Sequence, residues 1–507
     1  MKKLAIIGAN DFQNPLILKA KELGYETHVF AWQDGSIGEK TADYFYPISI
    51  VEKDKILEKC KEIGIDGITT IASDLATVTV NYVAKEMGLP GNSIECNIKS
   101  TNKYEMRKAF KENEVPTLRF ERVTDSSQLN LLSNMKYPLI VKPTDRSGSR
   151  AITKITNKSQ LKDAINKAIE NSFEKAAIVE EFIEGQEYSA EGITFNGEHR
   201  FLTITQKATT GAPNFIEIGH YEPAEISEEM KQKVYNELKK ALTALEITNS
   251  ATHSEFKIDA KGNIRIIEIG ARMGGDCIGS DLVELSTGYD YLKMVIDVAM
   301  GNKPIFKITH IPKISAIKFI LNQEDLDNFN KIKKERPEII YRQSNIEEVG
   351  SRKVVDSSTR FGFYIMSLNN MDDIKWLFYD NKEEKNNNTS LTKKKKTTIK
   401  NIIFLQLIIF IYTLASVVAK YASGEDFLSF NFILLYGIEI AILGIYAIFW
   451  QQIIKKFEIS VAYANRAISL LWSLLWAALL FSEKITIKNI IGVIIVIIGT
   501  ILINYDE

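Results

Sequence analysis

The composition of this chain changes abruptly between residues 381 and 400, and the change constrains what each side can fold into. Residues 1–380 alternate short apolar runs with amphipathic segments, as strands and helices of a globular protein do. Residues 401–504 are dominated by Ile, Leu, Val, Phe and Ala. The polar run between them, with four lysines at 393–396, has no apolar periodicity and predicts a flexible basic linker. At 507 residues, the chain is also too long for one core.

The first hundred residues predict a parallel α/β domain, because short apolar runs alternate there with amphipathic helices. Gly8-Ala-Asn10 is not a full dinucleotide fingerprint, so a nicotinamide site is rejected. Asp74 follows a strand, where it either faces a ligand at the carboxyl edge of the sheet or caps a helix. The expected strands are 4–7, 27–30 and 67–71, and the expected helices are 15–23 and 54–63.

Two glutamates, Glu255 and Glu268, lie in neighbouring apolar runs that predict a β-hairpin. Asp259-Ala-Lys-Gly262 offers the turn between them. Charged side chains at apolar strand positions are costly to bury unless they bind something, and carboxylate oxygens suit a hard cation. The pair therefore predicts a metal site, with two solvent-facing strand glutamates as the alternative.

Groups suited to phosphate precede and follow this hairpin. Lys103 and Lys142 supply cations, and Lys142 closes the apolar run 138–142. The small residues after it let backbone N–H groups approach phosphate oxygens. Beyond the hairpin, an arginine and two glycines offer a place for an anion and a close backbone approach. These residues are Ser147, Gly148 and Ser149 on the first side, and Arg272, Gly274 and Gly275 on the second.

The run from Lys103 to Gly275 resembles an ATP-grasp domain, with the motif order of carboxylate–amine ligases of the amino-acid ligase kind. A weaker resemblance extends over about residues 1–375. It implies ATP as cofactor with Mg²⁺, or Mn²⁺ as the alternative, held by Glu255 and Glu268. The implied ATP-binding residues are Lys103, Lys142, Ser147, Gly148, Ser149, Glu180, Glu181, Ile183 and Glu187, of which Glu180 and the backbone at Glu181 and Ile183 would meet adenine and Glu187 the ribose.

The same resemblance implies the substrate side. Glu217 and His220 form an E-x-x-H pair that would line an amino-acid pocket. Arg272 and the backbone near Gly275 would stabilise the acyl phosphate and the tetrahedral intermediate. His253 is expected to be structural, and Lys207 is within possible reach but is not counted as a site residue. One departure is Gly270, where the family usually carries a metal-binding asparagine.

The last hundred residues predict an all-α membrane domain. Four apolar stretches are each near the ~20 residues that cross a bilayer. The lysines favour both termini in the cytoplasm, which predicts a multi-pass protein of the cell membrane with a cytoplasmic ligase domain. The region resembles four-span small multidrug resistance and EamA-like transporters, although its first stretch has no acidic residue. The expected stretches are 402–419, 430–450, 461–481 and 489–504.

The sequence thus predicts α/β and α+β folds in five parts. The predicted function is an ATP- and magnesium-dependent ligase that joins a carboxylate to an amine; the alternatives are a transporter with an ATP-binding domain and a biotin-dependent carboxylase. The expected partners are small-molecule carboxylates and amines, membrane lipid and a second copy of the chain, and the net charge of −1 suggests no nucleic acid. The parts are a preceding α/β domain (1–100), an ATP-grasp domain (101–310), an α+β segment (311–380), the linker (381–400) and the membrane domain (401–507).

Overall fold

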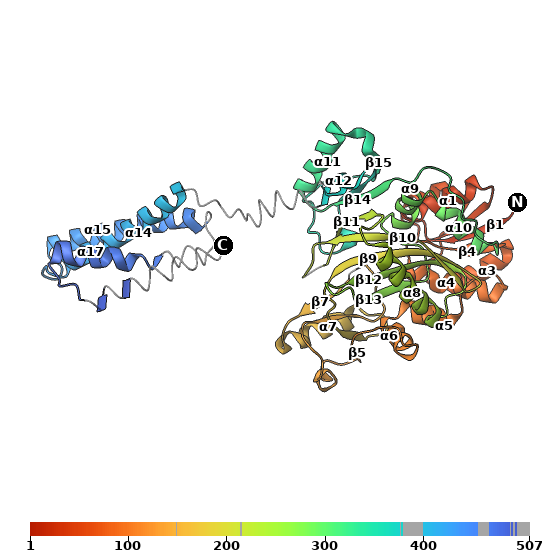
Figure 1. Cartoon of the computed structure of the whole chain (residues 1–507), viewed down its shortest axis with the longest axis horizontal. Helices are drawn as coiled ribbons and strands as arrows, with labels where there is room; N and C mark the ends of the chain where they lie inside the picture. Colours follow the sequence, from red (N-terminus) through yellow and green to blue (C-terminus); the bar gives the residue numbers. More distant parts are fainter. Residues whose placement is uncertain are drawn as a thin grey trace. The chain divides into compact units, whose positions relative to one another are not determined.

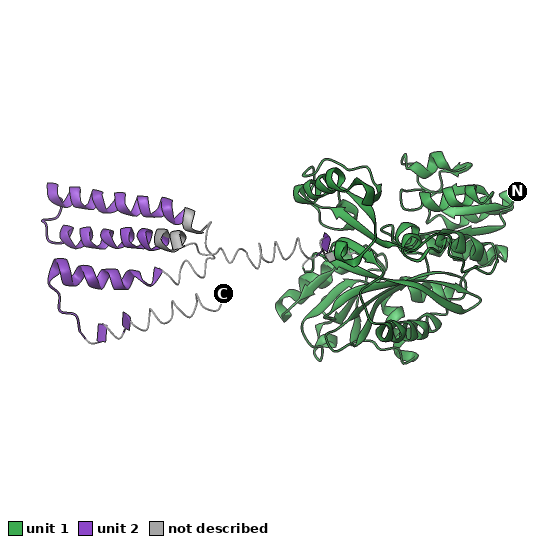
Figure 2. Ribbon diagram, turned by 45° about the horizontal axis from the view of Figure 1, so that its top comes forward, with its two compact units in different colours: residues 1–374 green, residues 375–507 purple. Residues whose placement is uncertain are grey.

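The computed structural model divides the chain into two compact units, Met1–Ile374 and Lys375–Glu507, which Figure 2 colours separately. The structure describes residues 1–148, 150–212, 215–375, 377–378, 399–454, 466–486, 488–489 and 492–493. The first unit contains three β-sheets and the helices that pack on them.

Unit 1 begins with the parallel sheet that the alternation predicted. Its strand order is β3-β2-β1-β4, and all three pairings are parallel. Ser73 caps helix α4 by accepting from the Ala76 N–H, so Asp74 is the first residue of that helix and its carboxylate is left for other contacts. The elements are β1 Lys3–Ile7, α1 Asn14–Glu22, β2 Glu26–Phe30, α2 Ile37–Thr41, β3 Tyr44–Tyr46, α3 Lys53–Ile63, β4 Gly67–Thr69, α4 Asp74–Met87 and α5 Ile94–Thr101.

A small lobe follows, built on an antiparallel sheet of order β5-β8-β6-β7. Helix α6 leads into it: the Asn102 side chain accepts from the N–H groups of Tyr104 and Glu105, which begins the helix at Lys103. Helix α7 packs its apolar face on the lobe's sheet through Leu161 and Ile165. The elements are α6 Lys103–Glu112, β5 Phe120–Val123, β6 Leu139–Pro143, β7 Thr153–Ile155, α7 Leu161–Asn171 and β8 Ala177–Glu181.

The large sheet is the centre of unit 1, with the order β13-β12-β9-β10-β11-β14-β16-β15 (Figure 1). Alternation along its strands covers both faces: Tyr188 and Ala190 pack in one cluster with helix α8, whereas Ile193 packs in another with helix α10. The segment expected as a further α+β part adds β14, β15 and β16 to this same sheet.

The elements of this part are β9 Gln186–Phe195, β10 Glu198–Thr209, β11 Glu217–Glu222, α8 Glu228–Ala244, β12 Ser250–Ile258, β13 Ile264–Gly270, α9 Val283–Thr287, α10 Tyr291–Ala299, β14 Ile314–Ile320, α11 Gln323–Glu335, β15 Ile340–Gln343, β16 Gly362–Leu368 and α12 Met371–Lys375; short 3-10 or π segments are η1 Leu129–Leu132, η2 Lys158–Gln160, η3 Ile278–Leu282, η4 Pro337–Ile339 and η5 Ser357–Thr359.

Unit 2 is helical where it is described. Helices α14, Ile399–Ala422, and α15, Phe430–Ile454, are long and apolar enough to cross a membrane. Helix α17, Ser469–Phe481, has 13 residues and is shorter than a span. These two helices coincide with the first two predicted spans, whose crossing of a membrane stays a prediction. The fourth predicted span and the start of the third lie largely outside the described residues.

One buried carboxyl group in unit 1 makes a stability prediction. Glu222 ends β11 with no exposed side-chain surface, and it accepts hydrogen bonds from Thr205 Oγ1 and Ser286 Oγ, both at 2.7 Å. Burial raises the pKa of Glu222 to about 8. Because the folded pKa exceeds the unfolded one, the native state retains a proton that the unfolded chain releases, so this stabilisation is lost as the pH rises from about 4.5 towards 8.

Glu222→Gln should therefore raise the free energy of unfolding at pH 8 by on the order of 2 kcal/mol, and the melting temperature with it, because the amide has no titrating charge. Its oxygen accepts from one of the two hydroxyls and its NH2 group donates to the other. At pH 5 the two proteins should melt at nearly the same temperature. Thermal unfolding at the two pH values checks this. A variant that is less stable than the parent at pH 8 would contradict the buried, proton-retaining carboxyl group.

Candidate functional site

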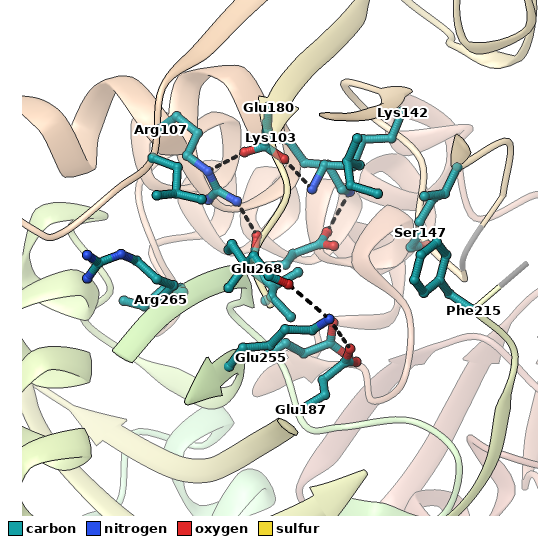
Figure 3. A pocket seen from close by; sticks show the side chains of 18 of the residues that line it. Lys103, Arg107, Lys142, Ser147, Glu180, Glu187, Phe215, Glu255, Arg265 and Glu268 are labelled. Atoms are coloured by element: carbon teal, nitrogen blue, oxygen red, sulfur yellow. Dashed lines mark hydrogen bonds and ion pairs between the residues drawn. The ribbon is translucent and has the colours of Figure 1, made fainter. Parts of the chain in front are cut away.

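A cleft in unit 1 collects charged side chains from the large sheet and the small lobe. Its empty volume is about 1230 Å³, including the part open to solvent. Apolar side chains line part of it, among them Leu118, Ile140, Ile152, Phe182 and Ile266. Charged residues of the cleft come from the large sheet and the turn after β13, from helix α6 and from the lobe. Figure 3 labels Lys103, Arg107, Lys142, Glu180, Glu187, Glu255 and Glu268 among them, and Glu217 and Arg272 also line the cleft.

The predicted hairpin is present and brings its two glutamates together. Glu255 on β12 lies directly opposite Glu268 on β13 in the antiparallel register. The turn between them is held by Asp259, whose Oδ1 accepts from the N–H groups of Lys261 and Asn263. Lysines neutralise both carboxylates: Lys103 Nζ lies 2.8 Å from Glu268 Oε1, and Lys207 Nζ lies 2.6 Å from Glu255 Oε1.

This donor set fits a magnesium ion. Mg²⁺ is commonly held by one or two carboxylates together with substrate phosphates and water. Within the part of the chain that the structure describes, no group of three or more His, Cys, Asp or Glu side chains forms a metal cage. The opposed pair Glu255 and Glu268 therefore supplies two carboxylate ligands, and phosphate oxygens and water would supply the others. A cation there would compete with the lysines for the carboxylate oxygens.

Lys207 belongs to the site although it was not counted there. It is 4% exposed and lies on β10, with Nζ 3.5 Å from Glu187 Oε1 and 3.9 Å from Glu217 Oε1, besides its contact with Glu255. Burial alone would lower the pKa of Lys207. The three carboxylates raise it by more than burial lowers it, so the net pKa is raised and the lysine is charged at neutral pH. Lys207 thus lies next to all three carboxylates that were predicted to bind the metal (Glu255), the ribose (Glu187) and the amino acid (Glu217).

Lys142 is held by Glu180 rather than pointing freely into the cleft. Glu180 Oε2 lies 2.5 Å from Lys142 Nζ, and its Oε1 accepts from Arg107 Nε at 2.5 Å. Arg107 also donates through Nη2 to the Ile267 carbonyl at 2.6 Å, next to Glu268. Burial would raise the pKa of Glu180, but the charges of Arg107 and Lys142 lower it to about 2. The predicted adenine contact of Glu180 stays a prediction; its carboxylate is engaged in these pairs.

The remaining ATP-side residues lie around the same cleft. Arg146, Ser147 and Gly148 line it after β6, and the Arg146 carbonyl accepts from Lys103 Nζ at 2.7 Å. Gly148 has φ +72°, a conformation that other residues rarely adopt. Ser149 lies outside the described residues. Glu181, Ile183 and Glu187 also line the cleft.

Arg272 is oriented by Asp74 across two parts of the sequence. Its Nε and Nη2 donate to the two carboxylate oxygens of Asp74 at 2.8 and 2.9 Å. This pair explains the glycine at 270: a Cβ there would lie 2.7 Å from Asp74 Oδ1 and 3.3 Å from Arg272 Cζ. The asparagine usual in the family would therefore displace the ion pair, which fixes the arginine.

Glu217 and His220 lie on β11 at the end of the site nearest the C-terminal strands of unit 1. Ser357 Oγ donates to Glu217 Oε2. His220 is fully buried, its two ring nitrogens have no hydrogen-bond partner among the described residues, and its Nε2 lies 3.7 Å from Asp276 Oδ2. Burial lowers the pKa of His220, which favours the neutral imidazole.

His253, expected to be structural, bridges two carboxylates. Its Nδ1 pairs with the fully buried Glu191, and its Nε2 lies 3.2 Å from Glu255 Oε1. Glu191 also accepts from the Gly274 N–H at 3.0 Å, and a Cβ on Gly274 would lie 2.6 Å from Glu191 Oε1. Burial lowers the pKa of His253, but Glu191 raises it to about 9. The charged imidazole therefore holds Glu255 in place.

Sequence reasoning missed five residues of this network. For Glu191 a signal existed, because Glu187, Ser189 and Glu191 alternate along one strand and so share a face. For Arg107 the sequence offers no signal except its place one helical turn after Lys103 on α6. Asp276 and Arg360 stand in loops and Ser357 begins the short segment η5, and the contacts of all three are with residues distant in sequence.

The Glu180 pairs make a prediction about stability. Glu180→Gln should lower the free energy of unfolding by about 3 kcal/mol, because it leaves two buried cations without their counter-charge. Glu181→Gln is the matched control. The Glu181 carboxylate accepts from the Lys136 N–H at 3.0 Å on the surface, so the change should alter stability by less than about 0.5 kcal/mol. Denaturant unfolding of both variants checks this, and equal stability of the two would show that the buried pairs are not formed.

Comparison with known proteins places this cleft in a known fold. Residues 135–281 match the ATP-grasp domain. Alanine–anticapsin ligase of Bacillus subtilis is 28% identical over 273 residues, which cover 49% of this chain and 57% of that protein. D-alanine–D-alanine ligase A of Clostridium perfringens is 26% identical over 235 residues, covering 43% and 73%. The chain thus spans little more than half the length of the first of these relatives.

Solved structures agree on the fold. The L-amino acid ligase of Bacillus licheniformis superposes with a TM-score of 0.64 at 22% identity, covering 75% of this chain and 96% of that one. The phosphoribosylglycinamide synthetase of Anaerococcus prevotii gives 0.60 at 26% identity, covering 74% and 96%. The predicted ATP-grasp fold is confirmed, and one structure of this fold, an N5-carboxyaminoimidazole synthetase of Staphylococcus aureus, is a complex with ADP. Unit 1 of this chain contains an ATP-grasp domain.

Proposed function

We propose that the chain is an ATP- and magnesium-dependent ligase that joins a carboxylate, an amino acid in particular, to an amine through an acyl phosphate. One observation carries the proposal: the opposed carboxylates of Glu255 and Glu268 share a cleft with Lys103, Lys142 and Arg272. Phosphoryl transfer needs this combination of a metal site and fixed cations. The named ligases among the relatives support it.

In the first half-reaction, a carboxylate oxygen of the substrate attacks the γ-phosphorus of ATP and the bond to the β-γ bridging oxygen breaks, giving acyl phosphate and ADP. Bound magnesium would neutralise charge on the phosphate oxygens. Glu268 holds Lys103 and Glu180 holds Lys142 in the cleft, so both charges would be in place for the phosphate oxygens before transfer. The loop 146–148, which lines the cleft, would offer backbone N–H groups to the phosphates.

In the second half-reaction, the amine attacks the acyl carbon, the carbon–oxygen bond to phosphate breaks, and the nitrogen loses a proton. Arg272, fixed by Asp74, stabilises the negative charge on the tetrahedral intermediate, together with the backbone near Gly275. Glu217 offers a carboxylate for the ammonium group of an amino acid, and neutral His220 can accept or donate a proton there.

Measuring ADP release by the purified protein against pairs of amino acids tests this proposal. Turnover should need Mg²⁺ and both substrates. Glu268→Gln should reduce it by at least ~10³-fold, because the variant removes a metal-bound charge. Glu246→Gln, which alters an exposed ion pair with Lys99, is the control and should keep full activity.

Three outcomes would count against the ligase. They are normal turnover by the Glu268 variant, ADP release that depends on bicarbonate and no amine, as a carboxylase would show, and no amino-acid-dependent turnover at all.

We further propose that unit 2 is a multi-pass anchor of the small multidrug resistance or EamA-like type, with unit 1 in the cytoplasm. Support comes from α14 and α15, which are long and apolar enough to span a bilayer. In the α15 window only 6% of the residues are buried within the protein, so its apolar surface needs another apolar medium. Transport of the ligation product is the second role that unit 2 could have, and it is tested by measuring movement of the product across vesicles that contain the full-length protein.

Fractionation tests the anchor. The full-length protein should stay with membranes through salt and carbonate washes, because apolar helices are not an electrostatic attachment. A chain ending at residue 380 should be soluble and should be protected from thermal unfolding by Mg-ATP. Release of the full-length protein by carbonate, or aggregation of the shorter chain, would contradict the arrangement.

A further inference from the structure

The segment 303–313, which joins α10 to β14, holds three isoleucines at the surface of unit 1. The side chains of Ile305, Ile308 and Ile311 are 69, 56 and 83% exposed. Isoleucine is among the residues that folded proteins bury most often, and single exposed ones are common. A run of them in one short segment instead marks an interaction surface.

The backbone of this segment is fixed by contacts with the loop before α10. Ile308 forms a β-bridge with Tyr289, and the Thr309 N–H donates to the Gly288 carbonyl at 2.8 Å. Phe306 packs against the core of unit 1, with its ring centre 5.8 Å from that of Tyr289. The segment therefore contributes one aromatic side chain to the core while it presents its isoleucines to the outside.

Lysines are interleaved with the isoleucines along the segment. Lys303, Lys307 and Lys313 are all exposed, and none of them forms an ion pair within the part of the chain that the structure describes. No acidic residue occurs between positions 301 and 313. The surface that the segment presents is therefore apolar and basic at once.

The partner that fits this combination is an anionic lipid surface. Isoleucine side chains can enter the boundary between headgroups and acyl chains, while lysines lay their stems along apolar surface and keep their ammonium groups at the lipid phosphates. A second copy of the chain on the same patch would bring the same lysines together across a two-fold axis, where like charges repel. The cytoplasmic leaflet, at which the proposed anchor holds unit 1, is the anionic one.

Resting on the proposed membrane anchor, we propose that segment 303–313 docks unit 1 on the surface of an anionic lipid bilayer. The three lysines supply the attraction to the headgroups, and the three isoleucines supply the apolar contact. Unit 1 then contributes to membrane attachment in addition to the spans, through lipid and not through another protein.

Quenching by lipid in the full-length protein tests this. The three native cysteines are buried, so Ile311→Cys offers an exposed site for a fluorophore. In nanodiscs with nitroxide-labelled headgroups, the label should be quenched several-fold more when phosphatidylserine is mixed with phosphatidylcholine than in phosphatidylcholine alone. Ile98→Cys on α5 is the matched control: Ile98 is 50% exposed, its neighbour Lys99 is paired with Glu246, and quenching there should be the same in both lipids.

A second set of variants tests the lysines. Glutamine at positions 303, 307 and 313 together should reduce quenching of the label to its value in phosphatidylcholine, because the attraction to anionic headgroups is lost, and high salt should do the same. Glutamine in place of Lys331, Lys333 and Lys334, which are exposed on α11, is the control for the change in charge. These changes should leave the quenching as it was.

Equal quenching in the two lipids, equal quenching at the two labelled positions, or quenching that survives loss of the three lysines would each overturn the inference. So would a label that is shielded from aqueous iodide in detergent as the protein concentration rises, because a second copy of the chain would then cover the patch. The anchor is judged separately. A full-length protein that resists carbonate although its label is not quenched would keep the anchor and refute the docking, whereas release by carbonate with lysine-dependent quenching would do the reverse.

Discussion

The site depends on two carboxylates that face each other across a pair of strands. Glu255 and Glu268 are direct partners in the β12–β13 register, and like charges so placed repel unless cations lie between or beside them. Lys103 and Lys207 fill that need here. They come from α6 and β10, so the charge balance at the metal position ties the small lobe's entry helix to the middle of the large sheet. With substrates bound, the metal ion would neutralise the two carboxylates and the phosphates would neutralise the lysines.

A second constraint joins the first part of unit 1 to the strands that carry the paired glutamates. Asp74 begins helix α4 in the parallel domain, and its carboxylate holds Arg272 just beyond β13. Gly270 leaves the room for that pair. Glycine thus stands where the family usually has an asparagine, and the room it leaves fixes the direction of Arg272. The preceding domain therefore shapes the site, although its own sheet carries no nucleotide fingerprint.

The fold and much of the cleft could be predicted from local patterns. Alternating apolar runs gave the parallel sheet, and the Asp259 turn gave the hairpin, because both signals lie within a few residues. Contacts between distant segments left no such signal. Arg272 meets Asp74 across 198 residues, and Ser357 meets Glu217 across 140. Lys207 and Glu180 were visible as charges in strands, but their ion-pair partners depend on how strands and lobes are ordered.

The fate of one oxygen atom tests the central claim, that this cleft forms an acyl phosphate. The substrate carboxylate is labelled with oxygen-18, the ligation is run to completion, and the released phosphate is examined by mass spectrometry. Attack of the carboxylate on the γ-phosphorus predicts one labelled oxygen in each phosphate. Unlabelled phosphate, or label in AMP, would mean that water or an adenylate carries the reaction and would contradict the account.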